Sequence, residues 1–132
     1  MTIQVAISFG EFLDKLTILE IKAERIGDPD KRENVVRERD LLRRTWAEHP
    51  ASATDIAEAL ARLKAINEKL WDIEDAIRER ERARDFGAEF IELARAVYYT
   101  NDERAAVKRE LNRKLGSELM EEKSYADYSS EA

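Results

Sequence analysis

The fold is decided by the stretch Ile56–Ile77, which reads IAEALARLKAINEKLWDIEDAI. Its apolar residues recur at alternating spacings of three and four, the heptad pattern of a helix that packs along one continuous seam, as in a coiled coil. We expect this helix to run from about Asp55 to about Arg82. The seam ends because Arg80 and Arg84 occupy its next positions. Its members are Ile56, Ala59, Leu63, Ile66, Leu70, Ile73 and Ile77.

A second apolar seam follows a short connection around residues 85–87. Two amphipathic helices joined by a short connection pack side by side in opposite directions. We therefore predict an all-α fold, a helical bundle built on a long antiparallel helical hairpin. The second seam consists of Phe90, Leu93, Val97, Val107 and Leu111.

Residues 86–115 leave open whether the second arm of the hairpin is one helix or two. Thr100 and Arg104 interrupt its seam, and Thr100 with Glu103 has the pattern of a capping box, which starts a helix. We favour a break near Asn101 over a single helix.

Two shorter helices are predicted before the hairpin. Ser8 and Glu11 form a capping box at the start of the first, and we expect Gly27 to end it in the left-handed conformation. The pair Asp28-Pro29 is a second start signal, an acidic cap followed by proline. The second helix is expected to end near His49-Pro50.

The two ends of the chain are expected to differ from the helical middle. Ile3, Val5 and Ile7 alternate with Gln4 and Ala6, and this period of two predicts one short strand. That strand would pair with residues 118–125 or with a second subunit. Residues 1–125 are predicted to form a single domain, and residues 126–132 a disordered tail.

Composition excludes several classes of function. The chain has 132 residues, 39% of them charged, with a net charge of −6, so it lacks the excess of basic residues that nucleic-acid binding needs. There is no cysteine for a disulfide or a thiol nucleophile. No run approaches the roughly 20 apolar residues that cross a bilayer, and the N-terminus does not read as a signal peptide. We predict a cytoplasmic protein with no membrane contact.

Metal and cofactor sites are not predicted. Glu68, Asp72, Asp75 and Glu79 share one face of the central helix, but the bundles that bind two metal ions also use histidine, and His49 is the single histidine here. A stripe of solvent-facing acids explains this pattern better. We therefore expect no metal ion and no cofactor.

A polar patch lies beside the central seam. Asn67, Trp71, Glu74 and Arg78 follow one another at spacings of four, three and four, so they line one face of the helix. Folding the hairpin brings polar residues of its second arm to the same level. The candidate site residues are Asn67, Trp71, Glu74, Asp75, Arg78, Tyr98, Asn101, Asp102, Arg104 and Lys108.

Two interpretations of these candidates stay open. They could form a buried hydrogen-bond network that fixes the register of the helices. They could instead line a pocket for a small polar or anionic ligand, such as a sugar or a carboxylate, with arginine holding the anion and aromatic rings stacking on apolar faces. Catalytic signatures such as a glycine-rich phosphate loop or a nucleophile elbow are missing, and whether the chain is an enzyme stays undecided.

Five stretches in order resemble an uncharacterised bacterial family, a domain of unknown function. They are ISFGEFLDKLTILEIKAERI (7–26), NEKLWDIEDAIR (67–78), FIELARAVY (90–98), TNDERAAVK (100–108) and LGSELMEEKSY (115–125). The resemblance covers nearly the whole chain. It implies a small helical protein of the kind that accompanies glycosyltransferases in surface-polysaccharide assembly, and it implies no catalytic residue.

The resulting hypothesis is a non-enzymatic helical interaction module. It would be a homodimer and an accessory to surface-polysaccharide assembly, with a partner such as a glycosyltransferase. The alternative is a small enzyme or binding protein that holds a sugar or an anionic small molecule in a polar pocket at mid-bundle.

Overall fold

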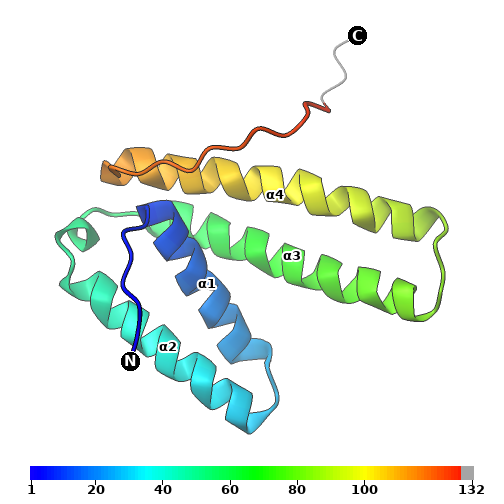
Figure 1. The fold of residues 1–132 in the computed structure, drawn as a ribbon, viewed down its shortest axis with the longest axis horizontal. Helices are drawn as coiled ribbons and strands as arrows, with labels where there is room; N and C mark the ends of the chain where they lie inside the picture. The colour runs from blue at the N-terminus through cyan, green and yellow to red at the C-terminus, as the bar shows by residue number, and fades with distance from the viewer. Residues whose placement is uncertain (129–132) are drawn as a thin grey trace.

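The computed structural model describes residues 1–128, and helices make up most of this part of the chain. No strand is present in it, so the all-α prediction is confirmed. Figure 1 shows the arrangement. The helical elements are α1 (Phe9–Arg25), α2 (Pro29–Glu48), the short 3₁₀-helix η1 (Pro50–Ala53), α3 (Ala57–Arg82) and α4 (Ala88–Leu115).

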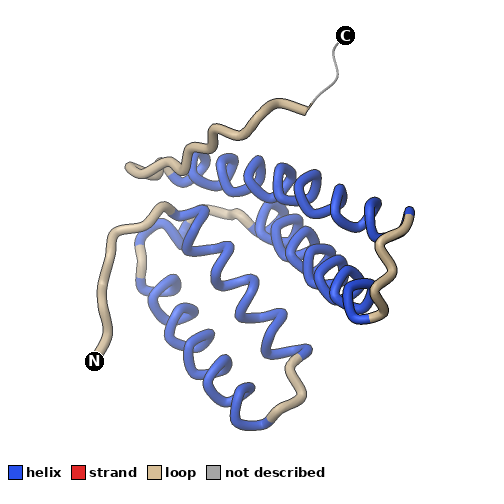
Figure 2. Tube along the Cα trace, turned by 45° about the vertical axis from the view of Figure 1, so that its right-hand side comes forward, coloured by secondary structure: helices blue, strands red, loops and turns tan. Residues whose placement is uncertain are grey.

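The longest helices, α3 and α4, lie side by side in opposite directions and are joined by residues 83–87. α1 packs across one end of this pair and contacts both helices, whereas α2 packs on α1 (Figures 1 and 2). The part of α3 and α4 nearest their connection therefore has neither α1 nor α2 over it. We call this part, residues 76–93, the hairpin end.

The core lies where α1 crosses the hairpin. Leu13 of α1 meets Leu63 of α3 and Leu111 of α4, and all three side chains are fully buried. By contrast, α2 buries none of its residues and is held through partly buried groups such as Trp46. Burial of apolar surface is the main stabilising term in folding, so the three-helix crossing supplies much of the hydrophobic stabilisation of the fold.

The predicted start signals are confirmed. Ser8 caps α1 by accepting a hydrogen bond from the Glu11 N–H at 3.1 Å, and Asp28 caps α2. The Glu11 carboxylate, however, accepts a hydrogen bond from Lys108 at 2.8 Å. Of the two hydrogen bonds of a capping box, the one accepted by the Ser8 hydroxyl is therefore the one that forms. The prediction for Gly27 is wrong: α1 ends with extended backbone at Ile26, and Gly27 has no positive φ. The proline that opens α2 favours extended backbone at Asp28, and nothing in the structure explains the conformation of Gly27.

The predicted break near Asn101 is also wrong, because α4 continues unbroken through this residue. Thr100 is buried, so its side chain faces the bundle instead of capping a new helix. Tertiary packing has overridden a local start signal. The end of the helix is as predicted: Gly116 adopts φ 67°, and the Ser117 N–H donates to the Asn112 carbonyl at 2.8 Å.

The strand predicted at residues 3–7 does not form. These residues are exposed, and a strand needs an extended neighbour to share its hydrogen bonds. The segment 118–125 lies along α4 instead (Figure 1). Within the predicted disordered tail, residues 129–132 lie outside the described residues. Tyr128 is described, and its hydroxyl donates a hydrogen bond to Asp102.

Candidate functional site

A buried aspartate stands at the centre of the three-helix crossing. Asp14 is 1% exposed and lies on α1 directly after the core residue Leu13. Thr17 follows one turn later and is equally buried. A buried carboxylate is stable only when it is paired and hydrogen-bonded. The neighbours of Asp14 therefore decide whether α1 can occupy this position.

Arg104 of α4 supplies the pairing charge. Its Nε donates to Asp14 Oδ1 at 2.9 Å and its Nη2 donates to Asp14 Oδ2, which is the two-pronged geometry that suits arginine and carboxylate. The hydrogen bonds to Asp14 raise the pKa of Arg104 above its ordinary value, against the opposing effect of burial. The pair links α1 directly to α4.

Asn67 of α3 completes the link to the third helix. Its Nδ2 donates to Asp14 Oδ1 at 2.9 Å and to Thr17 Oγ1 at 2.9 Å. The Thr17 hydroxyl in turn donates to the Asp14 carbonyl at 2.8 Å. Side chains from three helices thus share one carboxylate.

Lys108 extends the arrangement towards the C-terminal segment. Its Nζ lies 2.8 Å from Glu11, 2.8 Å from Glu121 and 4.0 Å from Asp14. Burial lowers the pKa of Lys108, but the hydrogen bonds to Glu11 and Glu121 outweigh it and leave the pKa above its ordinary value. Lys108 is therefore charged at neutral pH. We call Asp14, Thr17, Asn67, Arg104 and Lys108 the buried network.

α1 and α4 also approach each other closely beside this network. The Gly10 N–H donates to Asn112 Oδ1 at 2.6 Å. A Cβ at position 10 would lie 2.5 Å from the Lys108 carbonyl oxygen, which is too close for any side chain. Glycine is required here by the contact between backbones, and it sets the depth at which α1 sits.

A cleft of about 500 Å³ opens next to the buried network, between α1, α3 and α4. We call it the central cleft. Arg25 borders it: its guanidinium lies 5.9 Å from the centre of the Trp71 ring and 2.6 Å from Asp72. The lining residues are Ile18, Ile21, Asn67, Leu70, Trp71, Glu74, Asp75, Arg78, Asn101 and Arg104.

The structure brings most, but not all, of the predicted site residues together. Seven of the ten line the central cleft, from both arms of the hairpin. Tyr98 and Asp102 do not: they line a different hollow with Tyr128, on the side of α4 that faces the C-terminal segment. Lys108 belongs to the buried network. The continuous helix explains this separation, because Tyr98 and Asp102 lie one turn apart on another face of α4.

The residues from α1 were missed by sequence reasoning. The predicted cluster drew on the hairpin alone, whereas Asp14 and Thr17 of the first helix hold its two halves together. A signal was present: these polar residues stand at a spacing of three beside Leu13 and Leu16, on the apolar face of the helix. A polar residue on such a face indicates a buried partner elsewhere.

These features define a class, a small all-α protein whose helices are tied together by a buried ionic network. Within that class the chain belongs to the family of unknown function DUF6165, whose model matches residues 3–131. No curated protein and no solved structure matches the chain. None of the helices in residues 1–128 combines the length and the apolar character needed to cross a bilayer.

Proposed function

We propose that the protein is a non-enzymatic helical interaction module that self-associates through the hairpin end. One observation carries the proposal: apolar side chains are exposed where neither α1 nor α2 covers the hairpin. Phe86 is 53% exposed and Ile91 is 54% exposed. Exposed apolar groups that gather at one place mark interaction sites.

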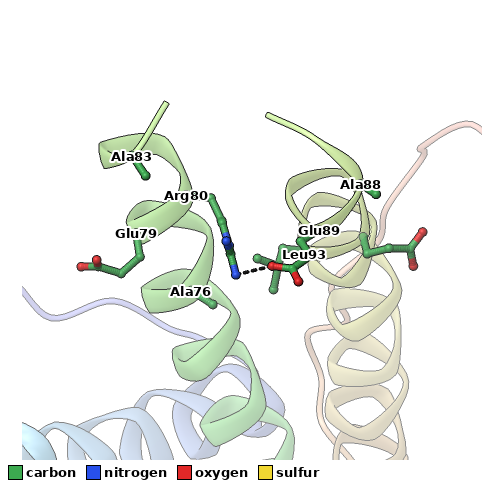
Figure 3. A pocket seen from close by; sticks show the side chains of 8 residues that line it. Ala76, Glu79, Arg80, Ala83, Ala88, Glu89 and Leu93 are labelled. Atoms are coloured by element: carbon green, nitrogen blue, oxygen red, sulfur yellow. Dashed lines mark ion pairs between the residues drawn. The ribbon is translucent and has the colours of Figure 1, made fainter. Parts of the chain in front are cut away.

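The hairpin end also carries a groove, which Phe86 and Ile91 do not line. It has a volume of about 740 Å³ and runs between α3 and α4, lined by the small side chains of Ala76, Ala83 and Ala88 and by Leu93. Figure 3 shows Arg80 reaching across it to pair with Glu89. The small side chains leave room for a partner's side chains.

The distribution of charge favours a second copy as the occupant. On the α3 side of the hairpin end Arg80 and Arg82 alternate with Glu79 and Glu81, whereas the α4 side carries Glu89 and Glu92. In a two-fold dimer the same patch meets itself, so the α3 side of one copy can face the α4 side of the other. Opposite charges would then meet around an apolar centre.

The test is a measurement of mass in solution by light scattering. We expect a dimer at tens of micromolar, and we expect Ile91→Glu to give a monomer with unchanged helical content, because a carboxylate would be forced into an apolar interface. The matched control is Leu41→Glu, which alters a residue of similar exposure, 48%, on α2. This variant stays a dimer. A monomeric wild-type protein, or loss of the dimer in both variants, contradicts the proposal.

The setting that we propose is surface-polysaccharide assembly, with a glycosyltransferase as a further partner. This rests on the family resemblance of the five stretches in the sequence. The cytoplasmic location stays a prediction from the sequence. Co-purification of the chain with a glycosyltransferase, lost in Ile91→Glu, would support this setting.

A second function, binding of a small molecule, is favoured by a separate observation. Asn67, Trp71 and Arg78 of α3 line the same cleft as Asn101 and Arg104 of α4, although the two groups are far apart in sequence. Trp71 is the natural reporter. A change in its fluorescence on adding sugars or anions would support binding, and no change with any of them would remove this candidate.

A further inference from the structure

The central cleft offers hydrogen-bonding groups that the protein itself does not use. The side chains of Trp71, Asp75 and Asn101 form no hydrogen bond with any other residue among residues 1–128, and each lines the cleft. Trp71 offers a donor, Asp75 offers acceptors, and Asn101 offers both. A ligand that donates and accepts would satisfy all three.

Pairing of the charged groups around the cleft leaves one carboxylate, Asp75, without an ion pair in the described part of the chain. Glu74 and Asp75 are acidic, and Arg78 and Arg104 are basic. Arg104 is already paired, because Asp14 accepts from its Nε and its Nη2. Arg78 lies 3.2 Å from Glu74. An anion would therefore meet two carboxylates and two arginines that are already paired, whereas Asp75 is available to accept hydrogen bonds from a ligand's hydroxyl groups.

One side of the cleft is apolar. Ile18 of α1 and Leu70 and Trp71 of α3 supply this side, whereas Ile21 is buried. Arg25 lies over one face of the indole, so a ligand in the cleft would use the other face or the edge of the ring. A flat ligand with C–H groups on one side suits such a surface. The volume, about 500 Å³, is within the range of sites for small molecules.

We propose that the central cleft binds an uncharged polyhydroxylated ligand of about the size of one or two sugar rings. The hydroxyl groups donate and accept with Asn101, Asp75 and the Trp71 N–H, and the C–H face lies on the apolar side. The proposal rests on the second function, binding of a small molecule at this cleft. It narrows that function to neutral ligands and excludes the anion that Arg78 and Arg104 first suggest.

The experiment uses the full chain with Trp46→Phe, so that Trp71 is the single tryptophan. The probes are glucose and N-acetylglucosamine as neutral sugars, glucuronate as an anionic sugar, glucosamine as a cationic sugar, and adenosine as a neutral aromatic ligand. Each is titrated while Trp71 fluorescence is followed, with calorimetry as a second readout. We expect saturable binding of a neutral sugar, with a dissociation constant on the order of 1–10 mM for a single ring in an open cleft.

Variants locate the binding. Asn101→Ala is expected to lower the affinity for the neutral sugar at least tenfold. The melting temperature should stay unchanged, because this amide has no hydrogen-bond partner among the described residues. The matched control is Asn34→Ala, an exposed asparagine on α2, which leaves binding unchanged.

Each contrary result has its own meaning. Tighter binding of glucuronate, glucosamine or adenosine than of the neutral sugars would overturn the ligand class and keep the cleft as a binding site. No saturable response to any probe would overturn both the class and the small-molecule function. If the affinity for the sugar changes equally in Asn101→Ala and Asn34→Ala, or changes in neither, the ligand binds elsewhere and the assignment to this cleft is overturned.

Discussion

Arg104 holds Asp14 with two parallel hydrogen bonds, although the two residues are separated by 90 positions and stand on the last and first helices. Asp14 is almost completely buried, and the side chain of Arg104 is 28% exposed. The pair is the main polar link between α1 and the hairpin, and α2 packs on α1. The position of half the molecule therefore depends on this pair, on further links such as Asn67–Asp14 and Lys108–Glu11, and on the core around them.

Removing Arg104 should destabilise the fold, because it leaves a buried carboxylate without its main partner. We expect Arg104→Ala to lower the free energy of unfolding by about 3 kcal/mol, measured by urea denaturation. Arg37→Ala on α2 is the matched control: Arg37 and its partner Glu33 are both exposed, so the loss should stay within about 0.5 kcal/mol. Equal losses in the two variants would mean that the buried pair contributes no more than a surface pair.

Replacing both members of the pair tests the same idea from the other side. In the double variant Asp14→Leu/Arg104→Met no charge is left unpaired. We expect it to lose less stability than Asp14→Leu alone, since a buried ion pair and an apolar pair of similar volume are often nearly equal. A strictly additive loss in this double-mutant cycle would contradict the coupling.

Two buried threonines make a matched pair for a second experiment. The Thr100 hydroxyl has no hydrogen-bond partner among the described residues, whereas the Thr17 hydroxyl accepts from Asn67 and donates to the Asp14 carbonyl. Thr→Val keeps the shape and removes the hydroxyl. We expect Thr100→Val to leave stability unchanged or to raise it by up to about 1 kcal/mol, and Thr17→Val to lower it by about 1–2 kcal/mol. A marked loss in Thr100→Val would reveal a partner of this hydroxyl, such as a bound water.

Gly10 and Gly27 should respond in opposite ways to the same substitution. A Cβ at Gly10 would lie 2.5 Å from a backbone oxygen of α4, while a Cβ at Gly27 would meet nothing within 4 Å. We expect Gly10→Ala to lower the free energy of unfolding by about 1–3 kcal/mol through overpacking. Gly27→Ala should be neutral or slightly stabilising, since it restricts the unfolded chain. Thermal denaturation of both variants decides; a neutral Gly10→Ala would show that α1 can shift outwards at little cost.

The pKa of Tyr128 should show whether the C-terminal segment is held against α4. The hydrogen bond to Asp102 raises the pKa of Tyr128 to about 12. Because this value lies above the ordinary pKa of about 10, the contact is fully present below pH 10 and is lost as the pH rises through about 12. Asp102→Asn removes the charge, and we expect the pKa of Tyr128 to fall towards its ordinary value.

The measurement is the ultraviolet absorbance of tyrosinate during a pH titration, with circular dichroism marking the range in which the helices remain folded. Asp30→Asn serves as a control, because Asp30 lies in the first turn of α2 and touches none of the tyrosines. An unchanged titration curve in Asp102→Asn would show that the segment is not held at this contact.

Much of the helical architecture could be predicted from local patterns. The heptad spacing from Ile56 to Ile77 predicted α3 to within two residues, and Ser8, Asp28 and Gly116 marked helix ends correctly. The errors have different causes: Gly27 and residues 3–7 are exposed, so burial does not explain them, whereas it does explain Thr100. Where a local signal competes with packing, as at Thr100, the buried environment decides, and local patterns carry no information about burial between distant segments.

The sequence by itself determined which stretches become helices, because spacing, capping groups and glycine act within a few residues of one another. It also placed the polar face of α3 beside its apolar seam. Only the tertiary structure decided that Asp14 of α1 binds Asn67 of α3 and Arg104 of α4. It also decided that Tyr98 lies outside the central cleft. The physical reason is that an ion pair and a cleft depend on distances between helices, and those distances are set by how the three-helix core packs.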